Sequence, residues 1–320
     1  MISSAEKLVV LFSVPLYTAV ILLEIAMSNW KMKGFYSWKE TLMNLYMTLA
    51  NMGVDVLFRG VYLLALFLAW EYRLTDGPEN LVLYWLTLFI LEDLAFYAEH
   101  RMDHSSRIFW AVHVTHHSSP EFNLSTGFRS SVLQPLYRFV YFMPIVFLGY
   151  QPMDILLMFS VTQIYGILVH TQFIRKMPAW FEAVFVSPSH HRVHHASNVL
   201  YLDKNMGMAL IIWDKLFGTF QAEEEEEPVK FGITKMPEEP HHPVKSVTHE
   251  FRNIFRDVAA APGLKAKLGY VFRPPGWSHD GSSKTSRQLQ EELQIQKRLE
   301  KDLKDVFERP LAGHSEMQES

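Results

Sequence analysis

The stretch HRMDHSSRIFWAVHVTHH, residues 100–117, places histidine at five of its eighteen positions. A second stretch, SHHRVHHASN, residues 189–198, adds four more. In HVTHH and in HRVHH the histidines are spaced i, i+3 and i+4, which puts three imidazoles on one face of a helix. The pair in HRMDH is spaced i, i+4 and shares a face in the same way. Three helical faces with two, three and three imidazoles are therefore expected.

The sequence around these stretches is that of a membrane protein. Hydrophobic residues make up 49% of the 320 residues, and they gather in long runs. A helix needs about 20 mostly apolar residues to cross the hydrocarbon core of a bilayer. Five segments are expected to cross: 8–27, 54–70, 81–98, 132–150 and 155–173. The first lacks the basic start and cleavage site of a signal peptide and is expected to be retained. A soluble all-helical protein is the alternative, and five runs near span length disfavour it.

The second segment belongs to a longer apolar run, 41–71, whose first half is expected to lie along the membrane interface. This run carries Asp55 and Arg59 at i,i+4 spacing. Lys and Arg residues follow the first, third and fifth segments, whereas the loops near Thr75 and Gln151 have only Arg73. By the positive-inside rule, both histidine stretches and the tail then lie in the cytosol.

Metal binding is the chemistry that the histidines indicate. The chain has no cysteine, so ligands must come from His, Asp or Glu. Imidazole suits iron, copper and zinc, and eight imidazoles exceed the four that a tetrahedral zinc site needs. Two metal ions with open positions fit this number better. The candidate ligands are His100, His104, His113, His116, His117, His191, His194 and His195, with His170 and His190 as further candidates.

The motifs HX3H, HX2HH and HX2HH, in this order, resemble the fatty acid hydroxylase/sterol desaturase superfamily of integral-membrane non-haem diiron enzymes. The segments FNLSTGFRSSVLQP (122–135) and SPSHHRVHHASNVLYLDKNMGMALIIWDKLFGTF (187–220) are most similar to the branch that contains alkylglycerol monooxygenase and its bacterial relatives. The resemblance implies that the eight histidines bind two iron ions. The branch also implies a reduced pterin, although Ser105 stands where the monooxygenase has glutamate.

The resemblance further implies a set of polar residues beside the ligands: Asp93, Asn123, Asp203 and Asn205. Such residues orient metal-bound imidazoles. Asp93 lies seven residues before His100, two turns back on the same helical stripe, so its carboxylate is expected to accept a ring N–H.

The predicted fold is an all-α integral membrane protein. It has a bundle of about five transmembrane helices, a cytosolic histidine-rich helical cap and a polar C-terminal tail. The expected parts are 1–80 (N-terminal membrane helices), 81–220 (fatty acid hydroxylase-like catalytic region) and 221–320 (tail). In the tail, the acidic run 223–227 is expected to be a solvated linker, and 285–308 an amphipathic helix. The tail histidines His241, His242, His249, His279 and His314 are expected to be solvated.

The resemblance implies O2-dependent hydroxylation or desaturation of a lipid C–H bond, with the membrane as a partner and no nucleic acid. The chain has no haem-binding or nucleotide-binding motif, so an external electron donor is expected. A bacterial inner membrane is the expected location, or the endoplasmic reticulum in a eukaryote. Two alternatives stay open: a zinc-dependent membrane hydrolase with Asp93 as acid–base group, and a metal transporter, whose ligands should recur along a path through the spans.

Overall fold

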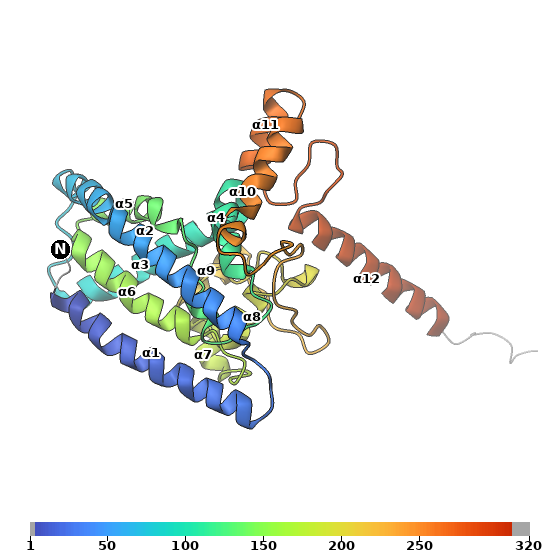
Figure 1. The fold of residues 1–320 in the computed structure, drawn as a ribbon, viewed down its shortest axis with the longest axis horizontal. Helices are drawn as coiled ribbons and strands as arrows, with labels where there is room; N and C mark the ends of the chain where they lie inside the picture. The colour runs from blue at the N-terminus through green and yellow to red at the C-terminus, as the bar shows by residue number, and fades with distance from the viewer. Residues whose placement is uncertain (1–3, 309–320) are drawn as a thin grey trace, which may run out of the picture.

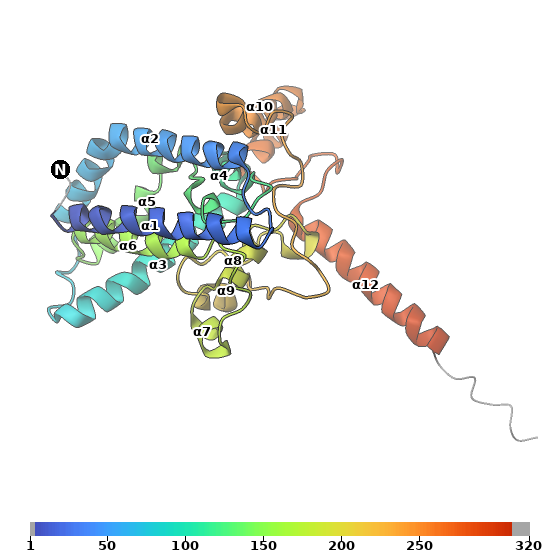
Figure 2. The ribbon, with the colours of Figure 1, turned by 60° about the horizontal axis from the view of Figure 1, so that its bottom comes forward.

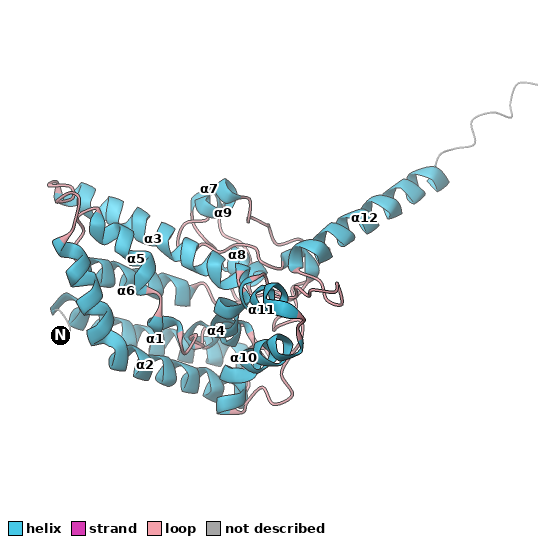
Figure 3. Ribbon diagram, turned by 90° about the horizontal axis from the view of Figure 1, so that it is seen from above, coloured by secondary structure: helices cyan, strands magenta, loops and turns pink. Residues whose placement is uncertain are grey.

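The computed structural model describes residues 4–308, with side chains for 11–305. Within this range it is built from helices and contains no strand, as Figure 3 shows. The α-helices are α1 (Ser4–Trp30), α2 (Trp38–Glu71), α3 (Leu81–Ser105), α4 (Arg107–His117), α5 (Phe139–Phe147), α6 (Pro152–Leu168), α7 (Ala179–Val184), α8 (Pro188–His194), α9 (Ile212–Phe217), α10 (Pro243–Ala260), α11 (Gly263–Phe272) and α12 (Ser286–Glu308). Three 3-10 helices, η1 (Thr126–Phe128), η2 (Gln134–Leu136) and η3 (Val199–Tyr201), lie between them.

Three helices are long and apolar enough to cross a membrane: α1 from residue 11 onward, α2 and α3. This confirms the prediction of an all-helical membrane protein. The two halves of the run 41–71, expected to lie along the interface and across the membrane, belong to one helix, because α2 continues from Trp38 to Glu71 over 34 residues. Ser37 caps its first turn by accepting a hydrogen bond from the Glu40 backbone N–H at 3.3 Å.

The prediction of a transmembrane helix at 132–150 is wrong. This segment forms η2 and then α5, whose nine residues extend only about 14 Å. Pro135 lies in η2, where its missing N–H cannot donate to a continuous helix. The next helix, α6, has 17 residues and extends about 26 Å, less than the length of a typical span. The bundle thus combines three long helices with two short ones.

The loops after α2 and after α5 lie together at the end of the bundle opposite the histidines (Figure 1). The Leu74 N–H donates to the Phe147 carbonyl at 2.8 Å, and the Thr75 hydroxyl donates to the Leu148 carbonyl at 2.7 Å. Gly149 has a φ of 88°, and a Cβ there would lie 2.3 Å from the Gly77 nitrogen. The sequence placed both loops on one side of the membrane, and the structure brings them to one end of the bundle.

Below these loops, side chains of α2, α3, α5 and α6 form the main apolar core of the described residues. Its members include Leu66, Leu88, Phe142, Val146 and Ile155. At the other end, Glu24 fastens α1 to the histidine-bearing cap. This buried carboxylate accepts hydrogen bonds from the Leu124 N–H at 2.8 Å and the Thr171 hydroxyl at 2.5 Å, and also from Tyr36.

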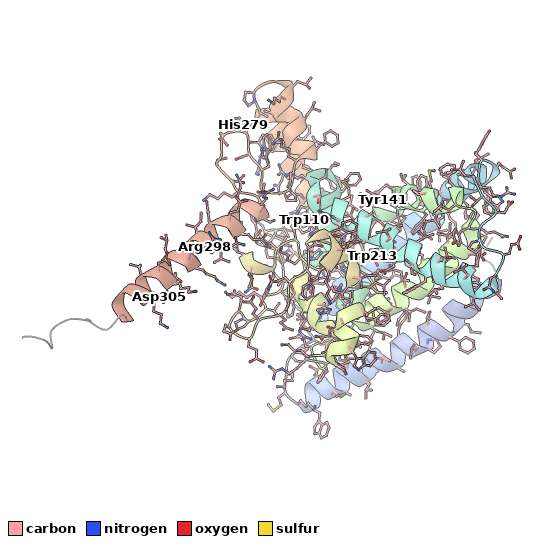
Figure 4. The ribbon with its side chains drawn as sticks, turned by 180° about the vertical axis from the view of Figure 1, so that it is seen from behind. Trp110, Tyr141, Trp213, His279, Arg298 and Asp305 are labelled. Carbon is pink, nitrogen blue, oxygen red and sulfur yellow. The ribbon has the colours of Figure 1, made fainter. Side chains whose placement is uncertain are left out.

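The tail packs on the cap through α10 and α11, which lie beside α4 (Figure 2). Arg107 at the start of α4 forms ion pairs with Glu250 at 2.7 Å and Asp257 at 2.8 Å. The expected amphipathic helix is confirmed as α12. It projects away from the bundle, with Arg298 and Asp305 on its outer part (Figure 4).

Two expectations for the tail are wrong. The acidic run is not a free linker, because Glu223 pairs with Arg192 at 2.7 Å and Glu227 accepts a hydrogen bond from Asn198 at 2.6 Å. His241 is not simply solvated, because its Nε2 lies 2.6 Å from a carboxylate oxygen of Glu40. All three contacts tie the tail to residues more than 25 positions away in the chain. His314 lies outside the described residues.

Candidate metal centre

The histidines come from four places in the chain that the fold brings together. The end of α3 carries His100 and His104, and α4 carries the HVTHH motif. His170 follows α6, and α8 with its C-cap residue carries the HRVHH motif. Ser106 makes the turn from α3 to α4, which brings two histidine faces of neighbouring helices against each other.

Nine histidines form two groups, in each of which the ring nitrogens lie within 4.8 Å of one another. All eight histidines of the predicted motifs belong to these groups, and His170 is the ninth. The first group is His100, His104, His113, His117 and His194; the second is His116, His170, His191 and His195. His190 belongs to neither. Its Nδ1 accepts a hydrogen bond from the Ser187 N–H at 3.2 Å, which completes a capping box at the start of α8.

Several ring nitrogens converge as the ligands of one ion do. The Nε2 atom of His113 lies 3.0 Å from that of His100 and 3.1 Å from that of His117. In the second group, the Nε2 atom of His170 lies 2.9 Å from that of His191 and 3.2 Å from that of His195. Nitrogens bound to one ion at about 2.1 Å lie about 3 Å apart when their bonds are near right angles. The spacing therefore fits a metal ion in each group.

Three buried ring nitrogens have no hydrogen-bond partner among the described residues. They are Nε2 of His104, Nε2 of His194 and Nδ1 of His191. An unsatisfied buried polar atom costs about 1–3 kcal/mol, so native proteins avoid it unless a bound group is the partner. The lone pairs on Nε2 of His104 and His194 are what a metal ion requires, whereas the nitrogen of His191 that converges with its group is Nε2.

The outer nitrogens of four histidines are held by backbone oxygen atoms. Backbone carbonyls lie 2.7–2.9 Å from Nδ1 of His100, His116, His170 and His194; the carbonyls belong to Met206, Arg129, Gly166 and Lys204 respectively. A carbonyl accepts only from an N–H, so Nδ1 carries the proton and Nε2 keeps its lone pair. This arrangement fixes both the tautomer and the orientation of each ring.

Burial keeps the histidines outside the membrane helices neutral. It lowers the pKa of His116 from 6.5 to about 4 and that of His170 from 6.5 to about 3. Burial is also the largest cause of the lowered pKa of His113, His117, His191, His194 and His195, and neighbouring histidines lower it further. Neutral imidazole is the form that binds metal.

One of the four predicted orienting residues contacts a histidine of the two groups. An oxygen of Asp203 lies 3.0 Å from Nδ1 of His104. Asp203 has a φ of 55°, in the left-handed region that non-glycine residues rarely adopt. Such backbone strain is found preferentially at functional sites, and here it accompanies the contact with a candidate ligand.

The expectation that Asp93 accepts a ring N–H from His100 is wrong. Its carboxylate instead accepts hydrogen bonds from the backbone N–H groups of Ala209 at 2.8 Å and Leu210 at 3.1 Å, and from the indole N–H of Trp213 at 2.9 Å. Asp93 thus fixes the chain that follows the last histidine motif.

Asn123 and Asn205 also order loops and do not contact the nine rings. The Asn123 side chain accepts from the Ser125 N–H at 2.9 Å. Asn205, whose φ is 55°, donates to the carbonyls of His190 at 3.0 Å and Gln221 at 2.8 Å. Short polar side chains tolerate such left-handed and turn conformations, which explains their presence here.

Asp103 and Ser131 are contacts of His113 that the sequence patterns did not reveal. The Asp103 carboxylate lies 3.5 Å from Nδ1 of His113, and the Ser131 hydroxyl lies 3.3 Å from it. Asp103 is fully buried and also accepts hydrogen bonds from Gln134 at 2.8 Å and Tyr137 at 2.7 Å. The signal that could have identified Asp103 is its place inside the HRMDH motif.

A cavity of about 530 Å³ reaches both histidine groups. His100, His113, His116, His170 and His191 form part of its wall. The rest comes from α2, α3, α5, α6 and the segment between η1 and η2, and includes Phe96, Phe139, Phe142, Leu156 and Phe159. Its volume is that of a small-molecule site.

Over residues 85–219 the chain matches the fatty acid hydroxylase family. It is 35% identical over 283 residues to an alkylglycerol monooxygenase of Homo sapiens, which covers 87% of this chain and 61% of that protein. For the enzyme of the same name from Xenopus tropicalis, the identity is 33%, over 90% of this chain and 62% of that protein. An ornithine lipid hydroxylase of Rhizobium tropici, OlsE, is 28% identical over 45% of this chain and 44% of that protein.

The chain spans about three fifths of the length of the alkylglycerol monooxygenases from Homo sapiens and Xenopus tropicalis. No solved structure matches it.

Proposed function

We propose that this chain, whose residues 85–219 form a fatty acid hydroxylase domain, is an integral membrane oxygenase that uses O2 to hydroxylate an aliphatic C–H bond of a lipid. One observation carries the proposal: two groups of buried histidines border a single cavity, and helices of membrane-spanning length form much of its remaining wall. The similar alkylglycerol monooxygenases and ornithine lipid hydroxylase support lipid oxidation as the chemistry.

Two iron ions are the proposed cofactor, one for each histidine group. His100, His104, His113, His117 and His194 would hold one ion, and His116, His170, His191 and His195 the other. The convergent and unpaired ring nitrogens fit this role. Bound iron would supply the redox chemistry that lets O2 attack an unactivated C–H bond.

The protein's own contribution is to position the ligands and the lipid. The carbonyls of Met206, Arg129 and Lys204 hold imidazoles in one tautomer before any ion binds. Because the histidines occupy one part of the cavity wall, the carbon to be oxidised would lie there. Apolar side chains around the rest of the cavity would hold the aliphatic chain and exclude water.

The lipid would enter sideways from the bilayer. Met52 and Val56 line the cavity, and they are 55% and 69% exposed on α2, a helix of membrane-spanning length. An opening at this level of α2 faces the region that lipid chains occupy. The substrate could then reach the histidines without leaving the membrane.

Hydroxylation of a C–H bond by O2 consumes two further electrons and two protons and releases water. An external donor is proposed for these electrons, with a reduced pterin as one candidate. The connection from α1 to α2, near which the sequence has Lys31, Lys33 and Lys39, lies at the end of the bundle where α8 lies (Figure 1), and this supports a cytosolic active site. A bacterial inner membrane is the proposed location.

Metal analysis and product analysis test the proposal together. The full chain, purified in detergent, should contain two irons per protein and consume O2 when reduced. Extracts of cells that express it should contain a lipid one oxygen atom heavier than its precursor, and the His194→Ala variant should not produce it. Stoichiometric zinc with ester hydrolysis would contradict the proposal.

A further inference from the structure

Three polar side chains on α2 have no part in the chemistry proposed above. Arg59 donates to the carboxylate of Asp55 at 2.6 Å and to the hydroxyl of Tyr62 at 3.1 Å. Tyr62 in turn donates to the other oxygen of Asp55 at 3.0 Å. Each member of this α2 triad therefore contacts the other two, which holds all three in one arrangement.

The triad lies within an apolar part of α2. The neighbouring side chains of Val56, Leu57, Val61 and Leu64 are all apolar and are 60–79% exposed, as is typical of a helix that faces lipid. Charged groups at membrane depth are costly and usually mark a functional site. A bundle that needed only stability would place apolar side chains at these positions.

The α2 triad also lines the cavity that reaches the histidines. Asn51 is the residue of α2 that is connected to the histidines, through Ser131. Its side chain donates to the Ser131 carbonyl at 2.8 Å. The hydroxyl of the same Ser131 lies 3.3 Å from His113. Arg59 follows Asn51 by two helical turns, so the triad lies about 12 Å farther along the helix axis. One lipid can therefore contact both places.

The chemistry of the triad favours an uncharged ligand. The positive charge of Arg59 and the negative charge of Asp55 cancel, so the triad offers no net charge to an anionic headgroup. A guanidinium has five N–H groups, and the two hydrogen bonds of Arg59 leave three without a protein partner among the described residues. The side chains of Arg59 and Asp55 are 33% and 26% exposed, so a ligand can reach them.

We infer that Asp55, Arg59 and Tyr62 determine substrate specificity by binding an uncharged hydrogen-bonding group of the lipid, such as a hydroxyl, while the carbon to be oxidised lies among the histidines. The inference rests on the proposed function, because it assigns the cavity to the lipid substrate. It adds a second point of contact that would fix which carbon of the chain is oxidised.

Three lipids of equal chain length separate the possibilities: hexadecan-1-ol, hexadecane and palmitate. Their binding to the full chain in nanodiscs is measured at equilibrium, without turnover, together with the metal content. Wild-type protein should bind hexadecan-1-ol most tightly. Arg59→Met and Tyr62→Phe should each weaken that binding about 10-fold and leave hexadecane binding unchanged, because a lost hydrogen bond to a polar group has about this effect.

The double variant Asp55→Asn/Arg59→Met replaces the ion pair with uncharged side chains of similar size, and it should show the same selective loss. Arg73→Met is the matched control, because Arg73 pairs with Asp76 at the end of the bundle opposite the histidines. This variant should bind all three lipids as the wild-type protein does. Tightest binding of palmitate, an equal loss for hexadecan-1-ol and hexadecane, or loss of metal in the triad variants would overturn the inference. If the proposed function is wrong but this inference is right, the protein would contain no iron or form no oxidised lipid, yet it would still bind hexadecan-1-ol more tightly than hexadecane or palmitate.

Discussion

At the scale of single residues, the roles of the two nitrogens of each imidazole decide what the site can do. Nδ1 of His194 is held by the Lys204 carbonyl at 2.9 Å, while its Nε2 is buried without a partner among the described residues. A ring held in this way is oriented before any ion binds. The remaining nitrogen has no role in the protein alone, so a bound metal is its natural partner.

The first prediction follows from this orphaned nitrogen. His194→Ala removes one ligand from the five-histidine group, so we expect less bound metal and no turnover. Elemental analysis of the purified protein and a lipid product assay measure the two effects. His279→Ala is the control, because His279 lies outside both histidine groups and hydrogen-bonds to Tyr270 at an exposed position; this variant should leave both values unchanged. Normal metal content in the His194 variant would refute the assignment.

Two aspartates separate ligand orientation from loop support. Asp203→Asn keeps an oxygen beside His104 but removes the charge, and we expect about a 10–100-fold loss of metal affinity or activity in a protein of normal stability. Asp93→Asn has only one acceptor oxygen for three donors, and we expect it to lower the free energy of unfolding by about 1–3 kcal/mol. Metal titration and thermal unfolding of both variants distinguish the effects. Equal behaviour of the two would contradict this division.

The sequence was sufficient to find the histidines because their spacing is local. Positions i, i+3 and i+4 share a helical face whatever the rest of the chain does. The hydrogen-bond partners of Asp93 could not be predicted from local spacing. Ala209, for example, lies 116 residues away, and only the fold brings the two residues together. The same holds for the triad on α2: Asp55 and Arg59 were visible as an i,i+4 pair, but Tyr62 as their partner and the cavity that they line were not.

At the scale of elements, hydropathy identified the apolar segments but overestimated the helix in the segment 132–150. The segment 132–150 is apolar enough to suggest a span, yet it forms the short turn η2, where Gln134 donates to Asp103 at 2.8 Å, and then the nine-residue helix α5. This irregular segment lies over the histidines and lines the cavity.

Another element whose role emerged only from the structure is α10, which fastens the tail to α4. The Arg107 side chain is 10% exposed and pairs with Glu250 and Asp257. Arg107→Met leaves two acidic side chains without their partner, and we expect the free energy of unfolding to fall by about 3 kcal/mol. Arg287→Met is the control: its pair with Glu291 is exposed, and exposed pairs contribute at most about 1 kcal/mol. Chemical denaturation and proteolysis of the tail measure the difference, and equal stability of both variants would contradict this role.

At the scale of the whole molecule, the membrane helices and the cap share one interior. The cavity begins among the histidines and extends between α2, α5 and α6, so the candidate metal centre and the proposed lipid site are parts of the same space. A soluble cap attached to a separate membrane anchor would lack this continuity. The arrangement explains why so many imidazoles are buried at one end of a membrane bundle.

Burial of so many histidines should make the metal-free protein sensitive to acid. Burial lowers the folded-state pKa of His116 to about 4 and that of His170 to about 3, and those of five further histidines are lowered as well. The unfolded chain, whose histidines titrate near 6.5, therefore binds more protons than the folded chain once the pH falls below that value. Stability is fully present above pH 6.5 and is lost as the pH falls.

Each such histidine removes up to about 1.4 kcal/mol of unfolding free energy per pH unit below 6.5. We expect the melting temperature of metal-free protein in detergent to fall steeply between about pH 6.5 and 5. The His170→Gln variant replaces one titrating ring with an amide that does not titrate, so its melting temperature should fall less steeply. A melting temperature that does not change over this range would show that the histidines are already charged or exposed in the metal-free fold.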